Sequence, residues 1–291
     1  MIWLIGCKGM LGSEVAKQLG KQGLDFVGSD KEVDITEYKA LENFSKNNPG
    51  IKWIINCSAF TAVDAAETNK ELAELLNVRG PENIGKCARK IGAKVIHIST
   101  DYVFDGRGSV PYTENMPLCP IGVYGDTKAR GEIALEAQTE SYYIIRTAWL
   151  YGFNGKNFVY TMIKAMENRD FVKVVCDQRG TPTSAVNLAG IILKIIMNGN
   201  VPFGIYHCTD FGETDWYNFA LKIYELGKKY GKIQSDCEVL SCTTEEYPTP
   251  AKRPAYSILS KDKIQKALNI KLKPWEKSLE DFISSESFNL V

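Results

Sequence analysis

The sequence has few of the residues that would build a metal centre. It contains only two histidines, His97 and His207, and none of its eight cysteines forms a Cys-x-x-Cys motif. Zinc sites and small disulfide-bonded folds usually need closely spaced ligands or thiols. We therefore expect reduced cysteines that fill core space, two histidines packed within strands, and no metal site that the sequence can locate.

Long hydrophobic runs and an excess of one charge are also missing. The apolar stretch at residues 191–197 is too short to span a bilayer, and residues 1–5 lack the basic start of a signal peptide. The 35 Lys and Arg residues balance 35 Asp and Glu residues, so these totals imply no basic face for nucleic acid. We expect a cytoplasmic protein that binds neither nucleic acid nor membrane.

What the chain does contain is a regular alternation of strand-like and helical segments. Helical spacing of apolar residues occurs at 81–91, 185–197 and 216–224, and a last helix is expected from about residue 274. The strand-like runs occupy residues 3–5, 25–28, 53–57, 94–99, 142–146, 173–175 and 204–207. Strands separated by helices predict an α/β fold with a Rossmann-type, doubly wound parallel sheet.

The character of the chain changes after about residue 210, where aromatic residues form one helical stripe and prolines mark a loop at 247–250. This composition predicts a smaller C-terminal lobe beside the sheet. The expected dinucleotide-binding domain comprises residues 1–148 plus about 185–209. The expected substrate-binding lobe comprises about 149–184 and 210–291.

A glycine-rich turn follows the first predicted strand and precedes a helix expected at 13–22. Its glycines allow a tight turn and a close approach of a pyrophosphate to backbone N–H groups. The helix N-terminus adds roughly half a positive charge at the same place. We expect this turn to bind a dinucleotide through Gly6, Gly9, Met10, Leu11 and Gly12.

Charged and small residues follow the next two predicted strands. Asp30 can bond the adenosine ribose hydroxyls, whereas Lys31 can meet a 2′-phosphate, so NADH and NADPH both remain open. Each of these charges is equally typical of a solvated loop. Asp34 and Ile35 are expected against the adenine. Small residues after the third strand would let the cofactor lie over the sheet, namely Cys57, Ser58, Ala59 and Thr61.

The strongest catalytic pattern is Tyr124-Gly-Asp-Thr-Lys128, because positions four apart share one face of a helix. A free phenol has a pKa near ~10, and a neighbouring ammonium lowers it. Thr100 ends the fourth predicted strand, where its hydroxyl can bond a substrate carbonyl. We predict Thr100, Tyr124 and Lys128 as the catalytic group, with Tyr124 and Lys128 also contacting the cofactor.

The chain resembles the dTDP-4-dehydrorhamnose reductases, a family of extended short-chain dehydrogenase/reductases. The most specific motifs are Ser99-Thr-Asp-Tyr-Val-Phe-x-Gly106 and Asp177-Gln-x-Gly180-Thr-Pro-Thr183. Less specific motifs span the rest of the chain, namely Gly6-x-x-Gly9-x-x-Gly12, Asn56-x-x-Ala59-x-Thr61-x-Val63-Asp64-x-x-Glu67, Tyr124-Gly-x-Thr-Lys128-x-x-Gly131-Glu132, Arg146-Thr-x-Trp149-x-Tyr-Gly152 and Arg253-Pro-x-x-Ser257.

The resemblance implies NADPH- or NADH-dependent reduction of the C4 ketone of dTDP-4-dehydro-L-rhamnose, a step toward cell-surface polysaccharide. It implies a possible homodimer and a possible divalent metal whose ligands cannot be placed. It also implies substrate contacts from Val63, Asp64, Thr100, Asp101, Tyr102, Trp149, Asn157 and Arg253.

Several alternatives remain open. The sugar can differ, the enzyme can be a nucleotide-sugar epimerase, or the chain can be a non-catalytic NADP-binding regulatory subunit. Trp149 is also typical of a core residue and Arg253 of an exposed one. Glu132 is interpreted as a capping or lobe-bridging carboxylate rather than a catalyst.

Overall fold

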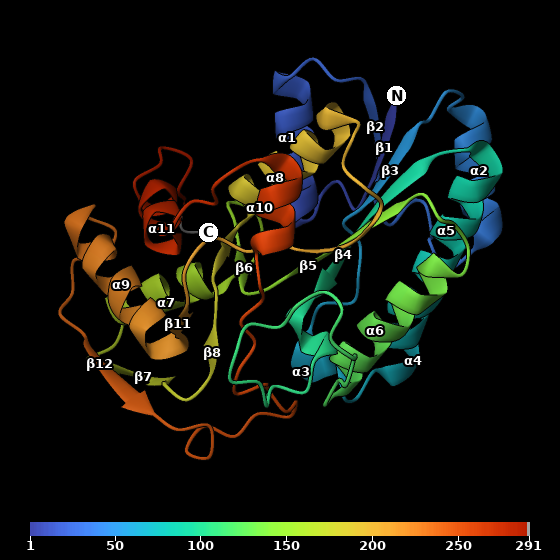
Figure 1. The fold of residues 1–291 in the computed structure, drawn as a ribbon. Coiled ribbons are helices and arrows are strands. Elements are labelled where there is room, and N and C mark those ends of the chain that lie inside the picture. The colour runs from blue at the N-terminus through green and yellow to red at the C-terminus, as the bar shows by residue number, and fades with distance from the viewer. Residues whose placement is uncertain (290–291) are drawn as a thin grey trace.

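The computed structural model describes residues 1–289 and is built around a six-stranded parallel sheet (Figure 1). The strand order is β10-β5-β4-β3-β1-β2. The strands are β1 (Ile2–Ile5), β2 (Phe26–Ser29), β3 (Trp53–Asn56), β4 (Lys94–Thr100), β5 (Tyr142–Thr147) and β10 (Gly204–His207). This architecture confirms the predicted α/β fold with a Rossmann-type sheet.

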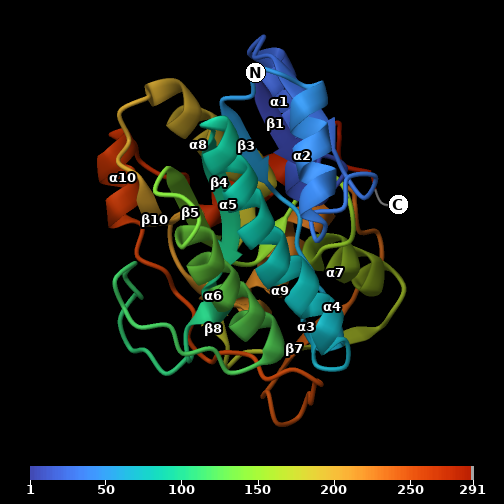
Figure 2. The ribbon, with the colours of Figure 1, turned by 90° about the vertical axis from the view of Figure 1, so that its right-hand side faces the viewer.

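Helices cover both faces of the sheet (Figures 1 and 2). Successive side chains of a strand point to opposite faces, so Leu4 packs under one helical layer and Trp3 under the other. The first layer contains α1 (Met10–Lys21), α8 (Ala185–Asn198) and α10 (Asp262–Leu268). The second contains α2 (Tyr38–Asn47), α5 (Gly80–Ile91) and α6 (Val123–Glu136).

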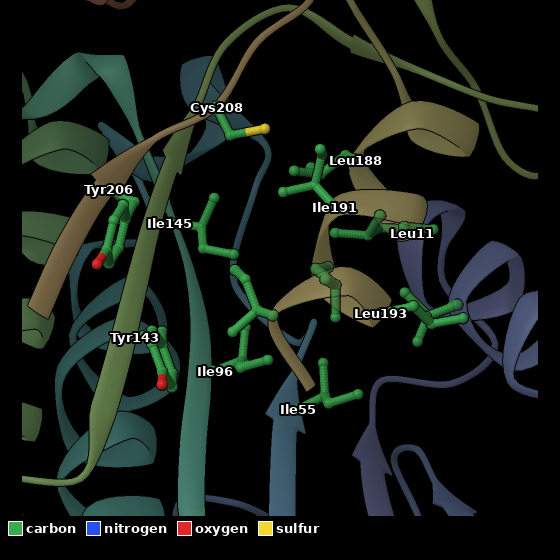
Figure 3. Close-up of a cluster of buried hydrophobic side chains, with 14 of the residues drawn as sticks. Leu11, Ile55, Ile96, Tyr143, Ile145, Leu188, Ile191, Leu193, Tyr206 and Cys208 are labelled. Carbon is green, nitrogen blue, oxygen red and sulfur yellow. The ribbon is translucent and has the colours of Figure 1, made fainter. Parts of the chain in front are cut away.

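The core between α8, α1 and the sheet is entirely apolar in its centre. Figure 3 shows Leu188 and Ile191 of α8 facing Ile145 and Ile96 of the sheet, with Leu11 of α1 beside them. Each of these five side chains is at most 6% exposed. Burial of a side chain of this size is typically worth ~1.5–3 kcal/mol, so this layer holds α1, and with it the glycine turn, against the sheet.

The order of the strands reverses at β1, because β2 is added on one side of it and β3 on the other. Ile5, at the end of β1, is in register with Ser29 and with Asn56. The loops that follow these three strands therefore emerge together at one edge. In doubly wound sheets, ligands bind outside the carboxyl ends of the strands at such a switch point.

A separate aromatic-rich cluster, called here the lobe cluster, lies beside the sheet (Figure 1). Its helices are α7 (Phe158–Glu167), α9 (Trp216–Lys229) and α11 (Trp275–Ile283), and its strands are β7 (Phe171–Val175) and β12 (Glu238–Cys242), which pair in parallel. The predicted strand at 173–175 thus pairs in this lobe, outside the central sheet. The exact domain limits remain a prediction.

Short elements connect these layers. The helical ones are α3 (Val63–Ala66), α4 (Lys70–Glu74), the π-helical turn η1 (Leu75–Arg79) and the 3₁₀ turn η2 (Asp101–Val103). The short strand pairs are β6 (Leu150–Tyr151) with β9 (Thr183–Ser184), and β8 (Arg179–Gly180) with β11 (Thr214–Asp215). Within residues 1–289, none of the helices combines the length and the apolar character needed to cross a bilayer.

Candidate active site

The glycine turn lies at the carboxyl end of β1 and packs directly on the loop after β3. Gly6 has a φ of +75°, which favours glycine, and its N–H donates to the Ser29 carbonyl at 2.8 Å. A Cβ on Gly6 would lie 2.9 Å from the Ser58 nitrogen, and one on Gly12 would overlap the Gly6 carbonyl oxygen. The backbone at both positions is therefore too closely packed for any side chain.

Gly9 precedes the first residue of α1, and among the described residues no side chain caps this helix end. The N–H groups of its first turn are the kind that bind anions, and the helix dipole favours negative charge there. Met10 and Leu11 begin the helix, but the Leu11 side chain is buried in the core. The predicted cofactor contact of Leu11 can therefore come from its backbone but not from its side chain.

Asp30 is fixed by the backbone of the loops around it. Its carboxylate accepts hydrogen bonds from the Lys8 nitrogen at 3.1 Å and the Lys31 nitrogen at 3.0 Å. Glu32 accepts from the Asp30 nitrogen at 2.7 Å and pairs with the Lys8 ammonium at 3.4 Å. Sequence reasoning missed Glu32, which adds a second carboxylate at the predicted ribose site, while Lys31 is exposed.

Asp34 and Ile35 have local roles in the structure. The Asp34 carboxylate accepts hydrogen bonds from the Thr36 nitrogen and hydroxyl, at 2.9 and 2.8 Å. Ile35 is 4% exposed, and its side chain packs where a Cβ on Gly80 of α5 would stand. The Ile35 side chain therefore belongs to the core, which leaves its backbone and Asp34 for the predicted adenine contact.

The loop after β3 is anchored by two buried asparagines. Asn56 Oδ1 accepts from the Ser58 nitrogen at 3.0 Å, and Asn77 in η1 accepts from the Phe60 nitrogen at 2.8 Å. Asn77 also donates to the Phe60 carbonyl and to the Thr127 hydroxyl of α6, both at 3.1 Å. The predicted cofactor residues on this loop are thereby held at the switch point, and they are Cys57, Ser58, Ala59 and Thr61.

Two glycines let α6 approach its neighbours closely. A Cβ on Gly125 would overlap the Tyr102 carbonyl oxygen, and one on Gly131 would overlap the Asn77 carbonyl oxygen. These contacts press the helix against η2 and η1. As a result, Tyr124 and Lys128 point toward the strand ends rather than into solvent, and Lys128 is only 2% exposed.

Thr100, Asp101 and Tyr124 form one polar group at the carboxyl end of β4. The Thr100 hydroxyl donates to Asp101 Oδ1 at 2.9 Å, and the Tyr102 nitrogen donates to Thr100 Oγ1 at 3.2 Å. Burial raises the pKa of Tyr124, and the nearby Thr100 hydroxyl lowers it in part. The Tyr102 and Tyr124 rings meet edge to face at 5.5 Å. The predicted catalytic threonine and tyrosine are thus brought together.

Burial controls the pKa of Tyr124 in this structure. The residue is partly exposed, but its hydroxyl lies deep, and burial raises its pKa to about 12 against the lowering effect of Thr100. Burial also lowers the pKa of Lys128 to about 8, which Glu132 opposes. Lys128 thus loses its proton at a lower pH than Tyr124 does. Lys128 is not among the groups that shift the pKa of Tyr124, so the expectation that its ammonium lowers this pKa stays a prediction.

Asp101 is a buried carboxyl group beside the predicted proton donor. Burial raises its pKa to about 6, and Oδ2 has no hydrogen-bond partner among residues 1–289. Ser257 lies near enough to lower this pKa in part, but its hydroxyl bonds the Arg179 carbonyl at 3.4 Å instead. The geometry therefore leaves one carboxylate oxygen of Asp101 unpaired.

Glu132 and Arg146 form a buried ion pair behind the tyrosine and lysine. The distance from Arg146 Nη2 to Glu132 Oε2 is 2.6 Å, and each side chain is 1% exposed. The Ser99 hydroxyl bonds the same carboxylate, and Arg146 Nη1 lies 3.3 Å from His207 Nε2. Glu132 thus ties α6 to β4 and β5, which differs from its predicted role as a cap or a bridge between lobes.

Trp149 lies where the sheet domain meets the lobe cluster. It has a φ of +47°, which is unusual for a residue with a side chain, and its ring stacks on Trp216 with 3.7 Å between centroids. A Cβ on Gly180 would lie 2.5 Å from the Trp149 ring. Asn157 caps α7 by accepting from the Tyr160 nitrogen at 3.1 Å and donates to the Gly152 carbonyl at 2.8 Å.

Arg253, from the C-terminal part of the chain, reaches the short helix α3 that follows the loop after β3. Its guanidinium pairs with both oxygens of Asp64, at 2.8 and 3.1 Å. Asp64 also accepts from the Ala251 nitrogen at 3.2 Å and follows Val63, the first residue of α3. Burial raises the pKa of Tyr102, and the positive charge of Arg253 lowers it in part. This cation therefore lies close to the group around Thr100.

The chain is similar along its whole length to proteins of one family. Residues 1–288 match the family described as RmlD substrate binding domain. The spore coat polysaccharide biosynthesis protein SpsK of Bacillus subtilis is 37% identical over 288 residues, covering 98% of this chain and 98% of that protein.

Solved structures agree with this match. A dTDP-4-dehydrorhamnose reductase from Clostridium acetobutylicum has a TM-score of 0.90 and 42% identity, covering 97% of this chain and 98% of its own. A dTDP-4-dehydrorhamnose reductase from Bacillus anthracis, solved in complex with NADP, has a TM-score of 0.90 and 34% identity, with 97% of both chains covered.

Proposed function

Because the chain belongs to the RmlD substrate binding domain family, we propose that it is an NAD(P)H-dependent oxidoreductase that reduces the C4 ketone of dTDP-4-dehydro-L-rhamnose to dTDP-L-rhamnose. The observation that supports this most directly is that Thr100, Tyr124 and Lys128 lie together toward the carboxyl end of β4, at the same edge of the sheet as the glycine turn after β1. Structural relatives named for this reaction, one of them solved with NADP, favour this substrate and cofactor.

The residues around the switch point fit a dinucleotide. At Gly6 and Gly12 any Cβ would collide with the chain's own backbone, so glycine is required for the turn to pack as it does. Among the described residues no side chain caps the α1 N-terminus that follows, so its N–H groups would be available to a ligand. Asp30 and Glu32 lie where an adenosine ribose would be bound, and carboxylates there favour free ribose hydroxyls. The dinucleotide, when bound, supplies a hydride to the carbonyl carbon of the substrate.

The chain's own residues would act on the carbonyl oxygen. The Tyr124 phenol donates its proton to the oxygen as negative charge develops on it, and general acid catalysis of this kind is typically worth ~10²–10⁴-fold. The Thr100 hydroxyl, which donates to Asp101 in this structure, would turn its proton to the same oxygen and stabilise it. Lys128 would hold the ribose and supply positive charge near the phenol when it is protonated.

The substrate would lie between the sheet and the lobe cluster. Tyr102, Trp149 and Arg253 come from three separate segments that border this region, and a guanidinium matches the geometry of a diphosphate. Val63, Asp64 and Asn157 are part of the same proposal, in which Asp64 and Asn157 act by holding Arg253 and the start of α7.

The test is an oxidation assay with NADPH and NADH against a panel of nucleotide-linked 4-keto sugars, with mass spectrometry of the products. We expect NADPH or NADH to be oxidised faster with the dTDP-linked 6-deoxy-4-keto sugar than with the other members of the panel. The sugar product should be heavier than the substrate by two hydrogen atoms. Lack of oxidation with every member would refute a reductase. Oxidation with another sugar alone would refute only the proposed substrate.

Two further expectations from the sequence are also proposals. A homodimer would appear as about twice the chain mass of 32.5 kDa in light scattering. A cytoplasmic location would appear as recovery in the soluble fraction of its own cells after gentle lysis.

A further inference from the structure

His97 lies in the middle of β4, in the last register pair of β3 with β4, and faces the predicted catalytic lysine. Its side chain is 1% exposed, and Asn56 is its register partner on β3. The His97 Nδ1 atom is 3.0 Å from Asn56 Nδ2, and Nε2 is 3.4 Å from Lys128 Nζ. The imidazole ring thus connects the loop after β3 with the lysine on α6.

The orientation of the Asn56 amide follows from its other partner. Asn56 Oδ1 is 3.0 Å from the Ser58 backbone nitrogen and 2.6 Å from the Ser58 hydroxyl. A backbone N–H can only donate, so the atom facing it must be the amide oxygen. The amide NH₂ group therefore faces His97, and His97 Nδ1 must accept its hydrogen bond.

This acceptor role determines which tautomer His97 adopts. Burial, together with the charge of Lys128, lowers the pKa of His97 well below its ordinary value, so the ring is neutral. A neutral imidazole carries one proton, and with Nδ1 accepting, that proton is on Nε2. The Nε2–H group consequently points toward the Lys128 nitrogen.

The two protonation states of Lys128 interact differently with this N–H group. An ammonium has three donors and no acceptor, so it faces the Nε2–H as donor against donor. The uncharged amine has a lone pair that can accept from Nε2–H, and it can still donate to the Ile98 carbonyl, 2.7 Å away. Within 1–289, the hydrogen-bond arrangement is therefore complete only for the amine.

We propose that His97, held by Asn56 in its Nε2–H tautomer, is a positioning residue that favours the uncharged amine of Lys128. Its role in catalysis depends on the proposed reductase function, because the charge on Lys128 is what would assist Tyr124 and hold the ribose. Protonation of this lysine then becomes sensitive to pH near neutrality instead of being permanent.

Other groups around Lys128 also affect its protonation equilibrium. Glu132, one turn further along α6, favours the ammonium, but its carboxylate is already paired with Arg146 of β5. Tyr124 on α6, and Asp101 and Tyr102 in η2, are other titratable groups of the site, and none of them is among the groups that shift the pKa of Lys128. Burial, which also favours the amine, acts in the same direction as His97.

The experiment reads Lys128 directly, without substrate. Protein labelled with ¹³C at the lysine Cε is titrated by NMR, and the Lys128 resonance is identified by its loss in Lys128→Arg. The variant His97→Gln replaces the ring N–H with an amide that can turn its oxygen toward the lysine. Asn56→Asp keeps the acceptor for Ser58 but offers His97 Nδ1 a second oxygen, which moves the ring proton from Nε2 to Nδ1.

We expect the wild-type midpoint to lie at least one unit below the ordinary lysine pKa of ~10.4, and both variants to raise it by about one unit, a tenfold change in the ionisation constant. His207→Gln, at the other buried histidine, should leave it unmoved. A wild-type midpoint at or above the ordinary value overturns the proposal, even where a variant fails to fold. The proposal is also overturned if Asn56→Asp raises the Lys128 midpoint but His97→Gln does not, because the added negative charge alone would explain that result.

Because no turnover is involved, this result is independent of the sugar assay. If the wild-type protein reduces a nucleotide sugar but Lys128 titrates normally, the proposal for His97 fails and the reductase function stands. If the lysine titrates as expected but no sugar is reduced, the proposal for His97 stands and the reductase function fails. In an active reductase, His97→Gln should also move the alkaline limb of the kcat/KM profile upward, which a purely structural role would not do.

Discussion

Arg253 and Asp64 form a two-point ion pair across 189 positions of the sequence, with distances of 2.8 and 3.1 Å. The pair joins α3 to the C-terminal segment and holds the guanidinium near Tyr102. Arg253 Nη1 also donates to the Ala251 carbonyl at 3.4 Å. The two side chains are 23% and 41% exposed, so the pair is worth little as a source of stability. In the proposed function, the pair instead holds a cation toward the substrate.

Replacing Arg253 with lysine should therefore weaken substrate binding more than it weakens the fold. A lysine keeps the charge but loses the fork that matches a diphosphate, and a hydrogen bond to a charged group is worth ~1.5–3 kcal/mol. We expect KM for the nucleotide sugar to rise about 10- to 100-fold with a change in unfolding free energy below ~1 kcal/mol. Arg89→Lys on the exposed face of α5 is the control, and equal KM values in both variants would contradict the role of Arg253.

Tyr124→Phe should lose turnover while it keeps dinucleotide binding. Phenylalanine retains the ring that packs against Tyr102 but has no proton to donate, so kcat should fall by about 10²- to 10⁴-fold. Binding of NADPH, followed by its fluorescence, should change little. Tyr143→Phe is a matched control, because that hydroxyl bonds the Val201 carbonyl at 2.7 Å, away from the site. It should cost about 1 kcal/mol of stability and no activity.

Much of the central fold could be predicted because its segments carry a local apolar pattern. The continuous apolar run at residues 2–5 and the apolar stretch of α8 indicate a buried strand and a buried helix without any knowledge of their partners. The pairing of β7 with β12 could not be predicted. Glu238–Cys242 has a mixed and partly exposed pattern, and its partner lies more than sixty residues away.

The site was predictable where chemistry requires a residue type at a fixed spacing, as for Tyr124 and Lys128. It was not predictable where polar residues are buried. The inward face of α6 carries Lys128 and Glu132, so hydrophobic periodicity does not identify this helix as a core element. His97 and Asn77 were equally hidden, because a single polar residue in or beside an apolar run reveals its partners only in three dimensions.

Gly131→Ala should destabilise the protein although alanine is the better helix former. The added methyl group would overlap the Asn77 carbonyl oxygen, so α6 must move away from η1. Such overpacking typically costs ~1–3 kcal/mol, and the shift would also displace Lys128 and weaken dinucleotide binding. Gly20→Ala in α1 faces open space and should instead stabilise by about 0.5–1 kcal/mol. Chemical denaturation of both variants measures the contrast, and the same sign in both would contradict it.

At position 149, a glycine variant should be more stable than an alanine variant, which reverses the usual order of stability. With a φ of +47°, any residue with a Cβ is strained there, so Trp149→Gly should be more stable than Trp149→Ala by about 1 kcal/mol. At Trp216, the first residue of α9, glycine should be less stable than alanine by about the same amount. Both Trp149 variants lose the stacked ring and should raise KM. Denaturation midpoints of the four variants decide the matter.

Asp101 should make the protein less stable as pH rises between about 4 and 6. The folded state holds this proton up to a pKa of about 6, whereas an unfolded aspartate releases it near 3.8. The folded state therefore binds more protons in this window, and stability falls with increasing pH until both states have lost the proton. The difference of about two pKa units corresponds to about 3 kcal/mol.

Asp101→Asn removes this titration and keeps the size of the side chain, so it isolates the contribution of one carboxyl group. Asp210, whose pKa burial also raises to about 6, is present in both proteins and cancels from the comparison. Urea denaturation at pH 4, 5, 6 and 7 should show the wild-type protein losing stability relative to Asp101→Asn up to pH 6, with only a small further loss by pH 7. Parallel curves across the range would mean that Asp101 ionises at its ordinary pKa despite its burial.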